Sequence, residues 1–589
     1  MEQNHYYTNE KNIQIIIALL KAHGIKKVIA SPGNSNLGFL GSIEFDPWFQ
    51  IWSAVDERHA AYMACGMAYE SGEPVVLTCT GASSARNYLP GLTEAYYRKL
   101  PVLALTTSQP LGHTGNLFGQ QLDHSFVPKD AARYSAQCRI VQSDEQYHDC
   151  ERLVNEAILE LFRHGGGPVH LNYETTFDTR FAEERLPDVR VMKRHFNYEN
   201  DLPPISAETK IAIIVGAHKP FSKSTLSALD RFACAYDAAV LCDATSSYSG
   251  PNRVSSALVC SQGIASNPAY QKLKPDLIIH IGEICNDYAT YGYLPGLAPV
   301  WRVSEDGELR DRWGRLEKVF EMREEDFFSR YADGIAERHY GYCRAWQDAD
   351  AALRSKIPDL PFSNLWMASQ LVPKIPSDAF LYLGVSTTLQ SWNAFVSGRT
   401  FASTANVGCC GIDGCVSGLV GASLANERRV HFGVVGDLTF FYDMNAIGNR
   451  HIKPNLRLLV VNNGCGAIFH SRGYATMRFG EDEVDRFHAA GGHFGNKSTC
   501  LLRDYASALG FKYLAATDKE AFAKAVPEFI SDSSDKPIVL ECFTDAENEA
   551  IAKTYKDTID RYVPPLTMKG EIKKMIPQGV KDAIKSLIK

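Results

Sequence analysis

The chain has 589 residues, of which 45% are hydrophobic and 22% are charged, a composition typical of a soluble globular protein. A formal net charge of −7, without a dense stripe of Lys and Arg, excludes nucleic acid as an expected partner. The chain shows neither a signal-peptide pattern nor a run of about 18 apolar residues, so we expect a cytoplasmic location. Its 15 cysteines include no C-x-x-C pair, which favours buried free thiols over zinc ligands.

Short apolar runs rich in β-branched residues recur between helical stretches, and they predict strands buried on both faces of parallel sheets. After a predicted helix at 10–22, the runs lie at 26–30, 74–80, 101–107, 168–174, 211–217, 238–244, 277–282, 299–304, 379–386, 430–437, 456–463 and 536–544. This alternation predicts an α/β fold with three doubly wound parallel-sheet domains.

Polar joints divide these runs into three groups. We place a first domain at 1–185, a central domain at 190–355 and a third domain at 360–565. The second joint, 330–362, carries many charges and fits a helix as well as a linker.

The C-terminal tail, 566–589, is basic and spaces apolar side chains at helical intervals around Pro577. Basic amphipathic helices dock on anionic membranes. We nevertheless expect this tail to pack against the protein's own oligomer.

Two strand ends in the third domain bring oxygen ligands together. Gly436 and Asp437 end one predicted strand, and Asn463 ends the next, so their side chains emerge at the same sheet edge. Mg²⁺, or Mn²⁺ or Ca²⁺ in its place, prefers carboxylate, amide and main-chain oxygens, which Asp437, Asn463 and the Cys465 carbonyl supply. The N–H groups of a helix that begins near Leu438 suit phosphate oxygens. Gly-Asp and Asn-Asn-Gly also occur in ordinary turns, so the signal lies in their combination.

A second acidic position stands in the first domain. Glu57 follows an apolar segment and begins a predicted helix. A solvated acid at a helix start, stabilised by the helix dipole, is the ordinary explanation for such a residue.

Together these two signatures resemble those of thiamine-diphosphate-dependent enzymes. The resemblance implies that a metal at Asp437, Asn463 and Cys465 holds the cofactor's diphosphate beside Gly436 and Leu438. It implies that the Glu57 carboxyl bonds the aminopyrimidine ring and favours the imino tautomer, which deprotonates the thiazolium carbon. In that family the glutamate and the metal site come from different subunits, so the resemblance implies a homodimer or homotetramer with active sites at subunit interfaces.

Longer segments resemble one branch of that family, the menaquinone-biosynthesis synthase, which joins a succinyl semialdehyde unit from 2-oxoglutarate to isochorismate. The matching segments are SPGNSN, VDERHAAYMACGMA, TGASSARNYLPGLTEA, GCCGIDG, GDLTFFYDMNAIGNR and VVNNGCGAIF. They cover the two outer domains, whereas the central domain matches only in pattern. The resemblance implies that Ile412 wedges the bent cofactor and that Ile468 and Phe469 form an apolar wall of the substrate pocket. Ordinary core packing explains these three side chains as well.

This chain departs from the branch at four arginines that hold substrate carboxylates there. The residues in their places are Ser35, Gln109, Gln390 and Val407. A charge-assisted contact contributes roughly 1.5–3 kcal/mol, so we expect a less anionic pair of substrates. Arg86, His113 and His124 are candidates for partial compensation.

We therefore expect a thiamine-diphosphate-dependent 2-oxo-acid decarboxylase and carboligase, a transferase or lyase that passes an acyl-anion unit to an aldehyde or ketone, such as a sugar. The residues expected near substrate are Asn34, Ser35, Gln109, His113, Gln120, Gln121, Ser386, Gln390, Phe469 and His470. His113, His124 and His470 are candidate proton carriers. A simple decarboxylase, an authentic menaquinone-pathway synthase and a catalytically silent binding subunit remain alternatives.

Overall fold

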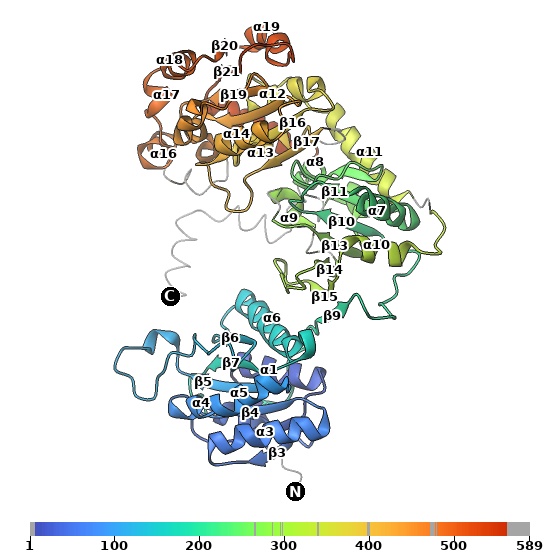
Figure 1. Cartoon of the computed structure of the whole chain (residues 1–589), viewed down its shortest axis with the longest axis vertical. Coiled ribbons are helices and arrows are strands. Elements are labelled where there is room, and N and C mark those ends of the chain that lie inside the picture. The colour runs from blue at the N-terminus through green and yellow to red at the C-terminus, as the bar shows by residue number, and fades with distance from the viewer. Residues whose placement is uncertain are drawn as a thin grey trace, which may run out of the picture. The chain divides into compact units, whose positions relative to one another are not determined.

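The computed structural model describes residues 6–263, 267–284, 287–294, 296, 298–338, 341–396, 401–471, 478 and 480–561. The chain forms two compact units (Figure 1). Unit 1 comprises Met1–Asn200 and Glu305–Glu321, and unit 2 comprises Asp201–Ser304 and Met322–Lys589. The predicted tail, 566–589, lies outside the described residues.

Unit 1 contains a six-stranded sheet in which every neighbouring pair is parallel. Its strands are β2 (Lys27–Ala30), β3 (Gln50–Ser53), β4 (Val75–Thr78), β5 (Val102–Ser108), β6 (Tyr134–Cys138) and β7 (Val169–Glu174). They lie in the order β3-β2-β4-β5-β7-β6.

Helices cover both faces of this sheet because successive strand residues point to opposite sides. On one face Val28 and Val76 pack with α1 (Lys11–Ala22) and α6 (Asp144–Glu160). On the other face Ile29 and Val75 pack with α3 (Glu57–Ser71) and α5 (Leu89–Arg98). The other elements of unit 1 are α2 (Leu37–Ile43), α4 (Ser83–Asn87), η1 (Leu111–His113), η2 (Arg163–Gly165), the antiparallel pair β1 (Tyr7–Thr8) and β8 (Phe181–Glu183), and the parallel pair β9 (Lys193–Phe196) and β15 (Leu316–Glu321).

Unit 2 contains a second six-stranded parallel sheet. Its strands are β16 (Phe380–Leu383), β17 (Ala402–Ala405), β18 (His431–Gly436), β19 (Leu456–Asn462), β20 (Lys512–Ala516) and β21 (Ile538–Phe543). Their order, β17-β16-β18-β19-β21-β20, repeats the order of unit 1 when each sheet is numbered from its own first strand. The two outer sheets therefore share one topology.

The second sheet is also covered on both faces. Helices α12 (Asn364–Leu371), α13 (Thr387–Trp392) and α19 (Lys519–Phe529) contribute to one core cluster. Helices α14 (Cys415–Ala425), α15 (Asp437–Tyr442) and α18 (Leu501–Ala508) contribute to the other. The remaining elements of this part are η5 (Val372–Lys374), η6 (Met444–Gly448), η7 (Ala467–His470), α16 (Glu481–Phe487), α17 (Phe494–Lys497) and α20 (Ala546–Thr558).

Unit 2 also holds a set of parallel strands that precede this sheet in sequence. These are β10 (Ile211–Val215), β11 (Ala239–Cys242), β12 (Arg253–Ser255), β13 (Leu277–Ile281) and β14 (Val300–Val303), in the order β12-β11-β10-β13-β14. The accompanying helices are α7 (Lys223–Tyr236), α8 (Ser256–Ser261), η3 (Pro268–Leu273), α9 (Tyr288–Tyr293), α10 (Glu324–Ala332) and α11 (Tyr342–Ser355). Helix α11 lies within the charged joint, as one of its two interpretations allowed.

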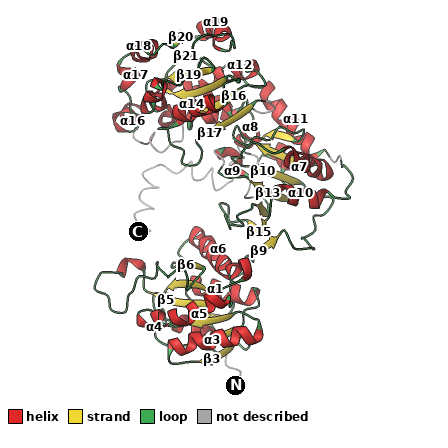
Figure 2. Cartoon of the chain, in the orientation of Figure 1, coloured by secondary structure: helices red, strands yellow, loops and turns green. Residues whose placement is uncertain are grey.

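The predicted fold class is confirmed: parallel sheets are flanked by helices throughout (Figure 2). Each of the 12 apolar runs is a strand, displaced by at most three residues at either end. The domain boundaries near 185–190 and 355–360 stay predictions.

Two expectations from composition concern cysteines and membranes. Every cysteine in the described ranges is a free thiol, and Cys409 and Cys410 are the exposed ones. Among the helices that the structure describes, none combines the length and apolar character needed to cross a bilayer.

Gly91 marks the closest approach of α3 and α5. A Cβ at this position would lie 2.4 Å from the Ala61 Cβ and 2.8 Å from its carbonyl carbon. We expect Gly91→Ala to lower the free energy of unfolding by about 1–3 kcal/mol in denaturant titrations, because the helices must separate. Gly66→Ala in α3 is the matched control, since its Cβ meets nothing within 4 Å, and it should stabilise by roughly 0.5–1 kcal/mol. Equal effects of the two changes would contradict this packing.

Candidate active site

The predicted metal ligands of unit 2 lie on adjacent strand ends. Strand β18 ends at Gly436, which pairs in register with Val461 of β19. Asp437 then begins α15, and the turn after β19 carries Asn463. The N–H group of Gly464 in this turn lies near enough to lower the pKa of the Asp437 carboxyl. The fold therefore places the Asn463 turn beside Asp437, and the role of these two residues as joint metal ligands stays a prediction.

The Asp437 side chain is buried, with 3% of its surface exposed. Burial raises its pKa to about 7, against the opposing effect of the N–H groups of Leu438, Asp437 and Gly464, and the negative charge of Glu541 adds to the rise. No Lys or Arg among the described residues forms an ion pair with it. A buried carboxylate without a counter-charge is costly, and a divalent cation removes that cost.

The donor set around Asp437 fits a hard cation. Asn463 Oδ1 accepts the Cys465 N–H at 3.3 Å, and the Cys465 carbonyl accepts the Ala467 N–H at 3.1 Å. Each of these oxygens keeps a second lone pair. A carboxylate, an amide oxygen and a main-chain oxygen are the ligands that Mg²⁺ and Ca²⁺ take.

A buried network under the turn was not foreseen. Asn462 Nδ2 donates to Glu541 Oε1 at 2.7 Å, and Tyr513 Oη donates to Glu541 Oε2 at 2.8 Å. Asn462 Oδ1 in turn accepts the Gly464 N–H at 3.2 Å. Glu541 therefore positions the metal turn and adds negative charge below it. The sequence feature that could have indicated this network is Glu541, an acidic residue inside the apolar run 536–544.

Ile412 lies half-buried in the turn before α14. This segment is tied to the one that contains Asp437, because Asp443, just after α15, accepts both the N–H and the hydroxyl of Ser417 in α14 at 2.6 Å. The structure therefore holds the Ile412 turn and the α15 segment as neighbours.

The residues after the metal turn form η7. Ile468, Phe469 and His470 are half-buried there. His470 Nε2 lies 3.0 Å from Asp485 Oδ1. The His470, Asp485 and Cys465 side-chain ligand atoms lie within 4.8 Å of one another. His470 is thus oriented by an exposed carboxylate beside the candidate metal turn.

Glu57 occupies the first position of α3 in unit 1. Asp56 supplies the N-cap and accepts the N–H groups of Arg58 and His59. The half-buried Glu57 carboxylate instead accepts from Asn87 Nδ2 at 3.4 Å. Burial raises the pKa of the neighbouring Tyr88, and the charge of Glu57 adds to the rise. Glu57 is therefore free of a capping role and turned toward α4.

Segments that follow β2, β4 and β5 meet at the carboxyl edge of the unit 1 sheet. The Ser35 and Thr107 hydroxyls lie 2.5 Å apart, and a Cβ on Gly33 would lie 2.2 Å from Thr80 Cγ2. Exposed Asn34 lies in the first of these segments, within 31–36.

The long connection after β5 completes this edge. Gln121 Oε1 accepts the Gln109 N–H at 3.0 Å, and Gln109 Oε1 lies 2.8 Å from His113 Nδ1. The His113 ring stacks on Phe118 with centroids 3.9 Å apart. Gln120 is exposed with a φ of +59°. Gln109, His113 and Gln121 therefore form one hydrogen-bonded group after β5.

The candidates for replacing lost positive charge behave differently in the structure. The Arg86 guanidinium donates to the carbonyls of Asp123 and Phe126, so it holds the long connection in place. Burial lowers the pKa of His124 to about 4, so this imidazole is neutral at pH 7. Val407, the fourth neutral residue singled out in the sequence, packs in the apolar core of unit 2.

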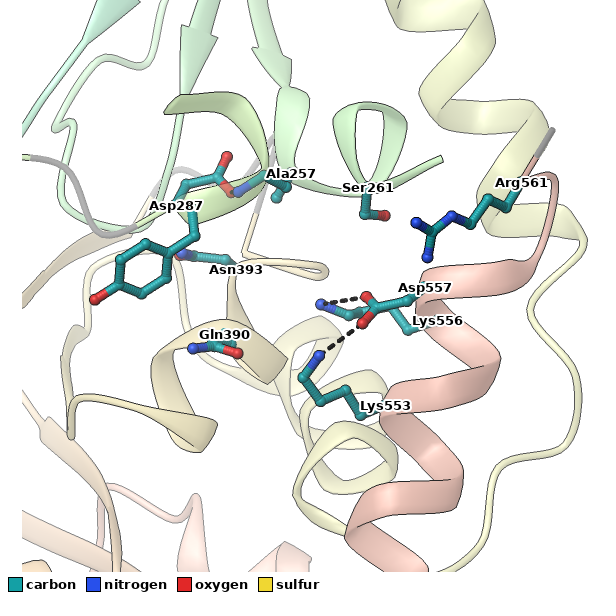
Figure 3. Close-up of a pocket in the computed structure, with 11 residues that line it drawn as sticks. Ala257, Ser261, Asp287, Gln390, Asn393, Lys553, Lys556, Asp557 and Arg561 are labelled. Carbon is teal, nitrogen blue, oxygen red and sulfur yellow. Dashed lines mark hydrogen bonds and ion pairs between the residues drawn. The ribbon is translucent and has the colours of Figure 1, made fainter. Parts of the chain in front are cut away.

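Two further residues predicted near substrate, Ser386 and Gln390, lie just before α13 and within it. Ser386 precedes the helix with φ +63° and ψ −130°, a conformation that costs a non-glycine residue on the order of 1–3 kcal/mol. Ala82 before α4 in unit 1 has almost the same angles, φ +61° and ψ −140°. Gln390, one helical turn into α13, lines a cavity of unit 2 (Figure 3).

Comparisons with known proteins identify relatives of this chain. Residues 11–127, which include Glu57 and the unit 1 loops, match the family described as thiamine pyrophosphate enzyme, N-terminal TPP binding domain. The chain is 30% identical over 567 residues to the 2-succinyl-5-enolpyruvyl-6-hydroxy-3-cyclohexene-1-carboxylate synthase of Bacteroides thetaiotaomicron, covering 93% of this chain and 99% of that protein. It is 28% identical over 557 residues to the synthase of the same name from Phocaeicola vulgatus, covering 92% and 97%.

The raised pKa of Asp437 predicts that the free energy of unfolding of the cofactor-free protein depends on pH. Its folded-state pKa of about 7 lies above the ordinary 3.8, so the folded chain binds this proton more tightly, and stability falls as pH rises from about 4 to 7. Asp437→Asn removes that ionisation. In denaturant titrations without metal, the variant should gain on the order of 1–2 kcal/mol over wild type between pH 5 and pH 7. A difference that stays constant across this range would contradict the assignment.

Proposed function

Since the chain belongs to the thiamine-diphosphate-dependent synthase family that includes 2-succinyl-5-enolpyruvyl-6-hydroxy-3-cyclohexene-1-carboxylate synthase, we propose that it decarboxylates a 2-oxo acid and transfers the resulting acyl-anion unit to an aldehyde or ketone. The observation that carries this proposal is the buried Asp437 carboxylate, which has no cationic partner among the described residues and lies against the Asn463 turn. Its oxygen-rich surroundings suit a metal that anchors a diphosphate.

In this proposal the chain's residues hold the cofactor at both ends. Asp437, Asn463 and the Cys465 carbonyl would bind Mg²⁺, and the main chain at Gly436 and Leu438 would lie beside the diphosphate. Ile412 and Ile468 would pack against the cofactor. When bound, thiamine diphosphate supplies the nucleophilic carbon and accepts the electron pair that CO₂ leaves behind.

Glu57 would hold the aminopyrimidine end of the cofactor. Its half-buried carboxyl would bond that ring and favour the imino tautomer that activates the reactive carbon. The amide of Asn87, the last residue of α4, donates to this carboxyl and keeps it oriented. Because Asp56 caps α3, the orientation of Glu57 costs the helix nothing.

In this proposal, polar residues at the carboxyl edges of the two six-stranded sheets contact the substrate. Ser35, Gln109 and Gln121 offer hydroxyl and amide groups without charge. Such groups suit the hydroxyls of a sugar-type acceptor. His113 and His470 are the proposed proton carriers, since each presents an imidazole beside a polar partner.

A second candidate function is the authentic synthase reaction of the relatives. Their similarity extends over nearly the whole length of both chains, which favours it. The residues at the four arginine positions favour a different acceptor. A plain 2-oxo-acid decarboxylase and a catalytically silent binding subunit are the other two alternatives.

The proposed assembly is a homodimer or homotetramer in which Glu57 of one subunit serves the metal site of another. Unit 1 exposes apolar and aromatic side chains on and beside α3 and α5, which suit a subunit interface. They are Val55, Tyr62, Tyr69 and Tyr97. A cytoplasmic location also stays a prediction.

Product analysis tests the reaction. The protein with thiamine diphosphate and Mg²⁺ is given pyruvate or 2-oxoglutarate, with and without glycolaldehyde, glyceraldehyde or isochorismate. We expect CO₂ release that depends on an acceptor and a ligated product in the mass spectrum, both lost in Asp437→Ala. Free aldehyde regardless of acceptor would identify a plain decarboxylase, and product from 2-oxoglutarate with isochorismate alone would identify the authentic synthase. If neither acid released CO₂, the catalytically silent binding subunit would be the remaining alternative.

Mixing two inactive variants tests the shared site. Glu57→Gln and Asp437→Asn are each expected to abolish turnover. After subunit exchange, mixed dimers hold one intact site, so activity should return to about a quarter of the wild-type value. A mixture that forms mixed dimers by native mass spectrometry yet stays inactive would show that each site is built within one subunit.

A further inference from the structure

A cavity of about 240 Å³ lies within unit 2, between α8, α9, α13 and the last turns of α20 (Figure 3). It is smaller than the roughly 300–1,000 Å³ typical of pockets for drug-sized ligands. Its walls include Ser261 and Asp287 above, Gln390 and Asn393 from the α13 segment, and a group of charges from α20. The Gln390 amide has no hydrogen bond to any described residue, so it is available to a ligand.

The α20 side of the cavity is electropositive. Lys553 Nζ and Lys556 Nζ lie 2.7 Å and 3.3 Å from the two oxygens of Asp557, so one carboxylate serves two ammonium groups. Arg561 adds a guanidinium that pairs with none of the described acids, and it points toward the cavity. On the far wall, Asp287 is engaged by the N–H groups of Ala289 and Thr290 at the start of α9.

The backbone that carries these cations is held in place by the surrounding structure. The buried Gln262 amide donates to the Lys556 carbonyl at 2.9 Å and accepts the Asp560 N–H at 2.9 Å. Asp560 is fixed in turn by Tyr270 Oη at 2.8 Å and by Lys356 Nζ at 3.2 Å. The end of α20 is therefore anchored on both sides of its charges. Preorganised cations lose little entropy on binding an anion.

Helix α20 also connects this cavity with the candidate cofactor turn. Its first residue, Ala546, packs against the cluster of Cys465 and Phe469. With a rise of about 1.5 Å per residue, Lys556 lies roughly 15 Å along the same helix. A helix that touches the cofactor turn at one end thus presents positive charge at the other, beside a residue already expected to contact substrate.

We propose that this cavity binds a small organic carboxylate, with Lys553, Lys556 and Arg561 as its counter-charges and the Gln390 amide as a further donor. The guanidinium fork suits the two oxygens of a carboxylate, and the lysines add point charges. The ligand is either the anionic end of a substrate or a separate effector. The first of these rests on the proposed carboligase function. Positive charge lost at the four arginine positions is thereby supplied by a different element.

Calorimetry with succinate, which contains no oxo group to react, tests the cavity directly. The full chain is titrated at constant ionic strength, with and without thiamine diphosphate and Mg²⁺. We expect saturable binding of succinate and none of its neutral diamide. Arg561→Gln should weaken succinate binding about tenfold, since a charged hydrogen bond contributes roughly 1.5–3 kcal/mol. Lys556→Gln should act likewise, and Lys524→Gln, an exposed lysine of α19 outside the cavity, should change nothing.

Kinetics distinguish the two sources of carboxylate. Succinate that competes with a 2-oxo acid, together with a raised KM in Arg561→Gln, indicates a substrate end, whereas a change in kcat without competition indicates an effector. Absence of succinate binding, equal binding in Arg561→Gln and Lys556→Gln, or displacement by inorganic phosphate at lower concentration would each overturn the proposal. Failure of thiamine diphosphate to bind, with succinate binding intact, would instead overturn the proposed function.

Discussion

The burial of the Asp437 carboxylate against the Asn463 turn is the constraint on which the candidate active site depends. Burial pushes its pKa to about 7, and Glu541 beneath the turn adds further negative charge. The arrangement weakens the cofactor-free fold, because two acidic groups stand near each other in a dry region. In the proposed function, a divalent cation between the carboxylate and a diphosphate would offset this loss of stability.

The repeated strand order explains why two distant parts of the sequence carry related sites. Both six-stranded sheets follow the same order, and both place their functional loops after the carboxyl ends of central strands. The likeness reaches single residues: Ala82 and Ser386, each just before a helix, share a strained backbone with positive φ. Such strain persists only where the surrounding structure enforces it.

The positive charge available to substrate in the described residues differs between the two units. Ser35, Gln109 and Gln390 are neutral, and Val407 packs in the core. Arg86 donates to loop carbonyls, and burial keeps His124 neutral at pH 7. Lys553 and Lys556 of α20, with Arg561 just beyond the helix, line the same cavity as Gln390. In the proposed carboxylate site these cations would supply the counter-charge.

The sequence by itself determined the fold class, the central strands and the placement of Asp437 and Asn463 at the ends of adjacent strands, because buried parallel strands read as unbroken apolar runs. It missed β3 and β20, whose largely exposed or half-buried residues give no such run, and the edge strand β17. Only the tertiary structure decided that Glu541 bonds Asn462 beneath the Asn463 turn and that Lys553, Lys556 and Arg561 line the same cavity as Gln390. These contacts join residues scores of positions apart, so no local pattern records them.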